Sequence, residues 1–164
     1  MPINLTERVS KQDLARLIVR LARTKDASEL CPAFSFEEDR LYSPCLMLGL
    51  VTYAFAVGIY SSERISILAR EDEELRRLCP DLFPNAEVVK CFRERNRLAI
   101  QDFLARAIQA VWEVTGEYPG AGQADNLNRN IPVPAKARER WVACEANEWM
   151  RRADGEDRRV RKPA

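Results

Sequence analysis

Hydrophobic residues recur along most of the chain at intervals of three and four positions, the spacing of one helix face. The first such set consists of Leu14, Leu17, Ile18, Leu21 and Ala22. It predicts an amphipathic helix with one buried stripe and with Thr6 or Ser10 as its N-cap. No run of alternating apolar and polar residues is long enough to predict a strand, so residues 24–44 are expected to form a connector.

Residues 46–60 are apolar nearly all round rather than on one face. Ser43 is suited to the N-cap of a helix here, Pro44 to its first position and Gly58 to its end. A helix that is apolar on every side belongs in the centre of a domain. The stretch is shorter than the ~20 residues that cross a bilayer, so a buried helix is the better interpretation.

Helical patterns continue towards the C-terminus. Three more helices are expected over residues 62–70, 71–78 and 85–115. After a Gly-, Pro- and Asn-rich loop at 117–134, a final helix is expected over 135–152 and a disordered basic tail over 153–164. We therefore expect an all-α fold, in which residues 1–116 form a compact multi-helix domain with a helix-turn-helix-like core.

Charge and histidine content narrow the function. The chain has 164 residues, with 26 Lys plus Arg, 25 Asp plus Glu and no His. A formal net charge of +1 gives no overall field that would attract nucleic acid or an anionic membrane. Without His, the chain has no Ser–His or Cys–His nucleophile and no imidazole ligand for a metal. We expect no enzyme activity, no catalytic residue, no cofactor, no metal and no membrane partner.

The cysteines point to a reducing compartment. There are five, at positions 31, 45, 79, 91 and 144, and none forms a CxxC pair. Cysteines with such wide spacing are expected to be reduced and mostly buried. The N-terminus also lacks an apolar core of signal-peptide length, so we expect a cytoplasmic protein.

One cluster of basic residues suggests a ligand. Lys90, Arg93 and Arg97 follow at i, i+3 and i+7, and Arg95 lies between them. In a helix-turn-helix, the last helix enters the major groove, where such side chains bind phosphates and guanines. The same stripe is also typical of a solvated helix face. Double-stranded DNA is therefore a candidate partner of these four residues.

The order of motifs adds a family resemblance. The motifs are Tyr42-Ser43-Pro44, the leucines at 46, 48 and 50, Gly58 followed by Ser61-Ser62, then Arg64-Ile65, and finally Pro84-Asn85 leading to Phe92-Arg93. In this order and spacing, the segment from Leu41 to Gly116 resembles the N-terminal domain of bacterial insertion-sequence transposases of the DDE type. Residues 13–30 are similar to that family's leading helix. The resemblance implies a helical DNA-binding domain.

The chain also departs from this family. The family's Asp-His-Ser-Thr run is replaced here by residues 85–88, where Glu87 would repel phosphates. In the family a ribonuclease-H-like catalytic domain follows, and the strand that opens it carries the first metal-binding aspartate just before a Gly-Thr pair. Here Asp125 lies in a Gly- and Asn-rich run, and about 40 residues remain, too few for such a domain. Three converging carboxylates for metal-dependent phosphoryl transfer are not expected.

Two functions remain open. The first is a stand-alone, transposase-derived DNA-binding or regulatory protein without a catalytic domain. The second is a protein–protein interaction module that kept the helical fold and lost DNA binding. In the second case, Trp141 and Trp149 of the final helix are candidate contacts for a protein partner or for a second copy of the chain.

Overall fold

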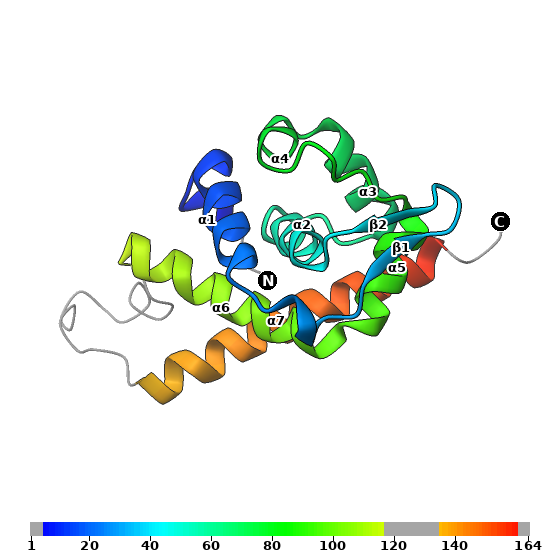
Figure 1. Cartoon of the computed structure of the whole chain (residues 1–164). Coiled ribbons are helices and arrows are strands. Elements are labelled where there is room, and N and C mark those ends of the chain that lie inside the picture. Colours follow the sequence, from blue (N-terminus) through cyan, green and yellow to red (C-terminus); the bar gives the residue numbers. More distant parts are fainter. Residues whose placement is uncertain (1–4, 117–134, 161–164) are drawn as a thin grey trace, which may run out of the picture.

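The computed structural model describes residues 5–116 and 135–160, and these residues are mostly helical (Figure 1). The α-helices are α1 (Lys11–Arg23), α2 (Pro44–Ala56), α3 (Ser62–Glu71), α4 (Glu73–Leu78), α5 (Ala86–Arg95), α6 (Arg97–Thr115) and α7 (Ala135–Val160). Two short strands, β1 (Ala33–Ser35) and β2 (Arg40–Tyr42), and two 3-10 turns, η1 (Leu5–Glu7) and η2 (Ala27–Glu29), complete the described part. The expected all-α fold is confirmed.

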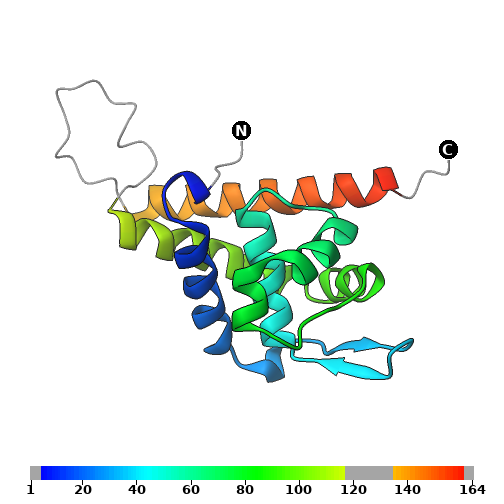
Figure 2. The same cartoon turned by 90° about the horizontal axis from the view of Figure 1, so that it is seen from above.

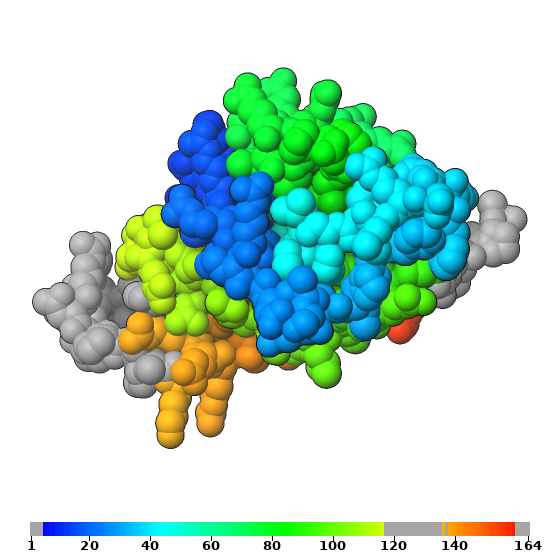
Figure 3. All heavy atoms as spheres, in the orientation of Figure 1, coloured from blue at the N-terminus to red at the C-terminus, as the bar shows by residue number. Residues whose placement is uncertain are grey.

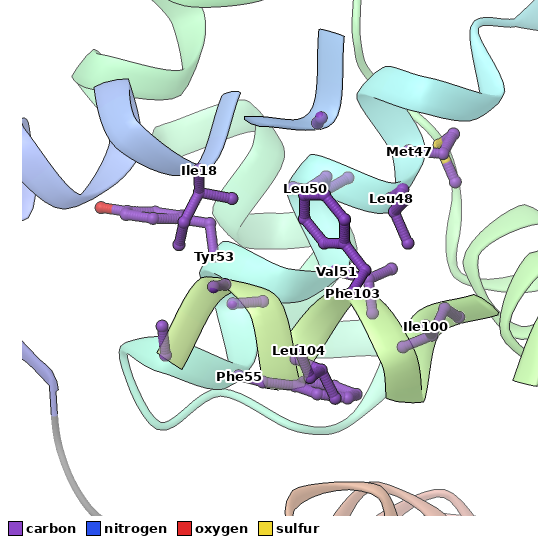
Figure 4. Packing of buried hydrophobic residues seen from close by; sticks show 14 of the residues in the cluster. Ile18, Met47, Leu48, Leu50, Val51, Tyr53, Phe55, Ile100, Phe103 and Leu104 are labelled. Carbon is purple, nitrogen blue, oxygen red and sulfur yellow. The ribbon is translucent and has the colours of Figure 1, made fainter. Parts of the chain in front are cut away.

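Helix α2 is the centre of the core, as its sequence predicts. Every residue from Met47 to Ala56 is buried. The Ser43 hydroxyl accepts a hydrogen bond from the Leu46 amide, Pro44 occupies the first turn, and Gly58 follows the helix with a φ of +85°. The positive φ explains why the chain turns at a glycine, since other residues adopt it at a cost. Figure 4 shows side chains of α1, α2 and α6 meeting around this helix.

Helix α1 lies against α2 at close range. A Cβ added to Gly49 would lie 3.2 Å from the Cβ of Ala22, so the two backbones approach each other more closely than larger side chains allow. Ile18 of α1 and Tyr53 of α2 are both fully buried near this contact (Figure 4). The Tyr53 hydroxyl donates to the Asp72 carboxylate at 3.0 Å, which ties α2 to the start of α4.

Helices α3, α4 and α5 form close to the ranges expected for them, and α5 packs against α3. Each begins with a side-chain cap. The residues Ser61, Asp72 and Asn85 accept hydrogen bonds from backbone amides three positions later. Such caps satisfy amide groups that have no partner inside the helix. The capping residues therefore determine where these helices begin.

The helix expected over residues 85–115 is instead two helices, and Asn96 separates them. Its side-chain oxygen accepts from the Cys31 amide at 2.7 Å, and its side-chain nitrogen donates to the Cys31 carbonyl at 3.2 Å. Asn96 is buried and lies 65 residues from Cys31. A buried amide of this kind needs both partners, and the contact draws the connector onto the junction of α5 and α6. Helical periodicity alone does not report such a long-range bond.

A β-hairpin occupies part of the segment expected to be a connector. Strands β1 and β2 are antiparallel, and Phe34 lies opposite Leu41. The Tyr42 hydroxyl bonds to the Glu38 carboxylate at 2.8 Å and to the Phe83 carbonyl at 3.0 Å. Arg40 donates to the Asp81 carbonyl at 2.8 Å, so tertiary contacts hold the hairpin in place. Strands of three residues are too short for an alternating pattern to be recognised.

The final helix extends further than expected. Helix α7 continues to Val160, so residues 153–160 are helical and not part of a disordered tail. Its buried residues Val142, Ala146, Trp149 and Ala153 recur at helical spacing, and α7 packs against α6, along which it runs (Figure 2). The remaining residues of the expected tail, 161–164, and the expected loop at 117–134, including Asp125, lie outside the described residues. Within the described ranges, no helix is both long and apolar enough to cross a membrane.

Candidate functional site

Helix α5 separates two different surfaces. On one side it faces the C-terminal end of α7, and charged residues of both helices line a cavity of about 360 Å³. On the other side it faces β1, and mostly apolar residues line a groove of about 310 Å³. The basic residues identified in the sequence belong to the first surface, except Arg95, which lines the second.

Arg93 is a buried residue, with 5% of its surface exposed. Its Nη1 atom donates to the Asp157 carboxylate at 2.7 Å, to the Ser62 hydroxyl at 2.8 Å and to the Tyr60 carbonyl at 3.1 Å. Loss of hydration lowers the pKa of Arg93, and the neighbouring Asp157 and Asp154 carboxylates oppose that shift. Arginine remains protonated at neutral pH even after such a shift. A charge therefore lies inside the protein, paired with a carboxylate.

Asp157 joins three helices at this point. Besides Arg93 of α5, its carboxylate accepts from the backbone amide and the hydroxyl of Ser62, each at 2.8 Å. Ser62 is the first residue of α3, so the negative charge lies at the positive end of that helix dipole. The Ser62 hydroxyl both donates to Asp157 and accepts from Arg93. The end of α7 is thus held to α3 and α5 by one polar network.

A second ion pair lies one turn away. Both Nη atoms of Arg97 donate to the Asp154 carboxylate, at 3.0 and 2.7 Å. These hydrogen bonds raise the pKa of Arg97. Both side chains are partly exposed. Beyond Ala153 no described residue of α7 is a buried apolar residue, so polar contacts hold this end of the helix.

The expected DNA-binding residues therefore have separate environments. Arg93 is buried and Arg97 is paired with α7, whereas Lys90 is half-buried at the edge of the charged cavity. Arg95 is exposed on the opposite side of α5. The predicted stripe of Lys90, Arg93 and Arg97 does converge in space, but acidic residues of α7 cover it. This pairing could not be predicted from the sequence, because Asp154 and Asp157 lie more than fifty residues away along the chain.

The two candidate partner-binding tryptophans pack within the chain. Trp149 has 1% of its surface exposed and belongs to the core, so its expected role as a partner contact is wrong for this structure. The Trp141 ring lies 4.3 Å from the ring of Trp112 on α6, and Trp141 is half-buried. An aromatic side chain on an amphipathic helix packs against an apolar surface, and here α6 provides that surface.

The groove between α5 and β1 is the more apolar of the two surfaces. Its floor includes Val88 and Phe92, which are buried. The rings of Phe34 and Phe36 meet edge to face with centroids 4.9 Å apart at its wall. Phe36 is 88% exposed and Leu41, opposite Phe34 in the hairpin, is 65% exposed. Figure 3 shows the hairpin, in light blue and cyan, at the right of the visible face.

We call Phe34, Phe36 and Leu41 the hairpin patch. Sequence reasoning missed these residues because it assigned residues 24–44 to a connector. Phe34 and Phe36 alternate with polar residues over only four positions, which is too short to predict a strand. Exposed aromatic residues in such a hairpin are a hallmark of a binding surface rather than of a core.

The described residues offer little for metal or thiol chemistry. Within the described residues, 5–116 and 135–160, no group of three or more His, Cys, Asp or Glu side chains could hold a metal ion. All five cysteines are free, and only Cys79 is fully buried, which corrects the expectation that most are. Burial raises the pKa of the Cys79, Cys45 and Cys91 thiols, so these remain protonated at neutral pH.

Comparison with known proteins identifies no relative, so a function is proposed below from these surfaces alone. No family model, no curated protein and no solved structure matches the chain.

Proposed function

We propose that the chain is a protein–protein interaction module that binds a partner protein at the groove between α5 and β1. The observation that carries this proposal is the hairpin patch beside an apolar groove. Phe36 and Leu41 expose most of their side chains to water, although the core of the same domain is well packed. Exposure of adjacent large apolar side chains costs free energy, which a partner would recover by covering them.

The surroundings of α5 favour a protein over duplex DNA as the partner. The exposed part of α5 carries the carboxylate of Glu87 as well as the cation of Arg95. Arg93 points into the protein and cannot reach a phosphate while Asp157 holds it. A DNA-binding surface needs an excess of accessible positive charge, because phosphate contacts supply most of the affinity.

A selection with a displayed library of random peptides tests the proposal. The full chain is the bait, and the same chain with Phe36→Ser and Leu41→Ser is used for counter-selection. The matched control is Val114→Ser, which removes an equally exposed apolar residue (71%) near the end of α6, far from the hairpin (Figures 1 and 2). We expect selected peptides to bind the double variant at least about tenfold more weakly and the control unchanged.

The proposal fails if every enriched peptide binds the three proteins equally. Thermal unfolding of each variant shows whether it is folded, and all three substituted positions are solvent-exposed, so large losses of stability are not expected.

A transposase-derived DNA-binding or regulatory protein is the second candidate. The convergence of Lys90, Arg93 and Arg97 at one place favours it, since these cations would form a continuous positive surface if α7 did not cover them. The test is titration of a labelled duplex at several salt concentrations. DNA binding would weaken steeply with salt, with a slope of about −0.9 per phosphate contacted. An affinity that does not change with salt concentration, or no binding at low salt, counts against this candidate.

A further inference from the structure

Charged residues around the groove have an uneven distribution. The charged side chains that line it are Glu37 and Glu87, at the end where α5 begins, and Arg95, at the end where α5 finishes. The hairpin turn next to Glu37 adds Glu38 and Asp39, both exposed. Glu87 and Arg95 are eight residues apart on one helix, which corresponds to about 12 Å along its axis. The groove therefore has an acidic end and a basic end.

Contacts within the chain fix the acidic end. The Glu37 carboxylate accepts a hydrogen bond from the Asn85 side chain at 3.5 Å, across the mouth of the groove. Glu38 accepts from the Tyr42 hydroxyl, which in turn reaches the Phe83 carbonyl. These bonds connect the hairpin turn to the segment before α5. The carboxylates are consequently held near the N-terminal end of α5 rather than spread over the surface.

We propose that the groove binds a segment of a partner protein that has large apolar anchor residues and a Lys- or Arg-containing flank, oriented with this flank at the N-terminal end of α5. This inference rests on the proposed function and adds the chemistry and the direction of the partner. The apolar anchors cover the floor at Val88 and Phe92 and the wall at Phe34 and Phe36, and Leu41 extends the apolar surface of the hairpin next to the groove. The basic flank lies beside Glu37 and Glu87, and the segment carries a neutral or acidic residue beside Arg95.

The size of the groove agrees with a peptide anchor. A volume of about 310 Å³ is at the lower end of the range for pockets that enclose a whole small molecule. It suits a few side chains of a segment whose backbone stays at the surface. In such an interface the apolar contacts supply most of the affinity, whereas the rim charges choose the partner and its orientation.

The test uses the same random peptide library with the full chain as bait. Peptides that depend on the hairpin patch are identified by their loss of binding to the Phe36→Ser and Leu41→Ser variant. We expect these peptides to be enriched in Lys or Arg at one flank of an apolar pair. A double charge reversal, Glu37→Lys with Glu87→Lys, should weaken them about tenfold and select peptides with acidic flanks instead.

The neutral pair Glu37→Gln with Glu87→Gln is the matched control and should give an intermediate loss. Both positions are exposed, so only small losses of stability are expected, and thermal unfolding of each variant checks that it is folded. A second readout is orientation: an Arg95→Glu variant should change the preference at the other flank only.

The outcomes separate the two proposals. Peptides that need the hairpin patch but carry neutral or acidic flanks would overturn the charge inference and leave the interaction module in place. A failure to find any peptide that depends on the patch would overturn both. Sedimentation velocity gives the remaining outcome. Self-association that Phe36→Ser with Leu41→Ser abolishes would show that a second copy fills the groove and would contradict a basic partner segment.

Discussion

The Asp157 carboxylate near the C-terminal end of α7 lies 2.7 Å from the Arg93 guanidinium of α5, across 64 residues of sequence. This ion pair and the adjacent Arg97–Asp154 pair hold the end of α7 over the basic face of α5. Two of the four residues that suggest DNA binding in the sequence, Arg93 and Arg97, are therefore paired with acidic residues of the same chain. The same contacts leave the opposite side of α5, with the apolar groove, as the accessible surface.

Removal of the Asp157 carboxylate is expected to destabilise the fold. Asp157→Ala leaves the buried Arg93 charge without its carboxylate and the Ser62 amide without an acceptor. Loss of one partner from a buried ion pair costs about 3 kcal/mol. Urea unfolding measures the difference from wild type. Asp154→Ala is the comparison, because its pair with Arg97 is partly exposed and is expected to contribute less than about 1 kcal/mol. Equal losses for the two variants would contradict a buried network at Arg93.

Trp149 is expected to act through stability and not through partner binding. Trp149→Ala removes a large side chain from the contact between α7 and the rest of the core, at a cost of about 4 kcal/mol. Trp141→Ala should cost less, because Trp141 is only half-buried against Trp112. Denaturant unfolding followed by circular dichroism ranks the two variants. If Trp141→Ala proves the more damaging, the assignment of Trp149 to the core is in error.

The raised pKa of Tyr42 predicts that the folded protein loses stability at alkaline pH. Burial, as the main cause, and the hydrogen bond to Glu38, as the second cause, raise the pKa of Tyr42 to about 12, above its ordinary value near 10. Between pH 10 and pH 12 the unfolded chain releases the phenolic proton while the folded chain retains it. The contribution of Tyr42 is therefore complete below pH 10 and falls by about 2 kcal/mol as the pH rises through this window.

The Tyr42→Phe variant isolates this effect. It lacks the proton, so its free energy of unfolding should decline less between pH 10 and pH 12 than that of wild type. At pH 7 the variant loses the bonds to Glu38 and Phe83 and is expected to be about 1 kcal/mol less stable. Parallel pH curves for the two proteins would show that Tyr42 ionises freely in the folded state.

Release of the basic face of α5 gives the sharpest test of the DNA-binding candidate. Asp154→Asn with Asp157→Asn keeps the shape of both side chains but removes the two negative charges that cover Arg93 and Arg97. If the chain is a DNA-binding protein, this variant should bind a labelled duplex at least about tenfold more tightly than wild type at low salt and show a steeper salt dependence. No gain in affinity, in a variant shown to be folded, argues against DNA as a ligand of this face.

Much of the architecture could be predicted from local sequence. Ser43, Pro44 and Gly58 mark both ends of α2, and Asn85 marks the start of α5, because caps and turns depend on residues that are close in the chain. The break at Asn96 and the β-hairpin could not be predicted in this way. Each depends on hydrogen bonds to distant residues, such as Cys31 and Phe83.

The sequence by itself determined where most of the helices form, that α2 is central, and that a basic stripe follows residue 85. Helical periodicity and capping are properties of neighbouring residues, so they can be recognised without a structure. Only the tertiary structure decided what the stripe contacts. Packing of α7 along α6 brings Asp154 and Asp157 to Arg97 and Arg93, so both cations are paired within the chain. Folding of the hairpin beside α5 likewise decided which apolar side chains remain exposed.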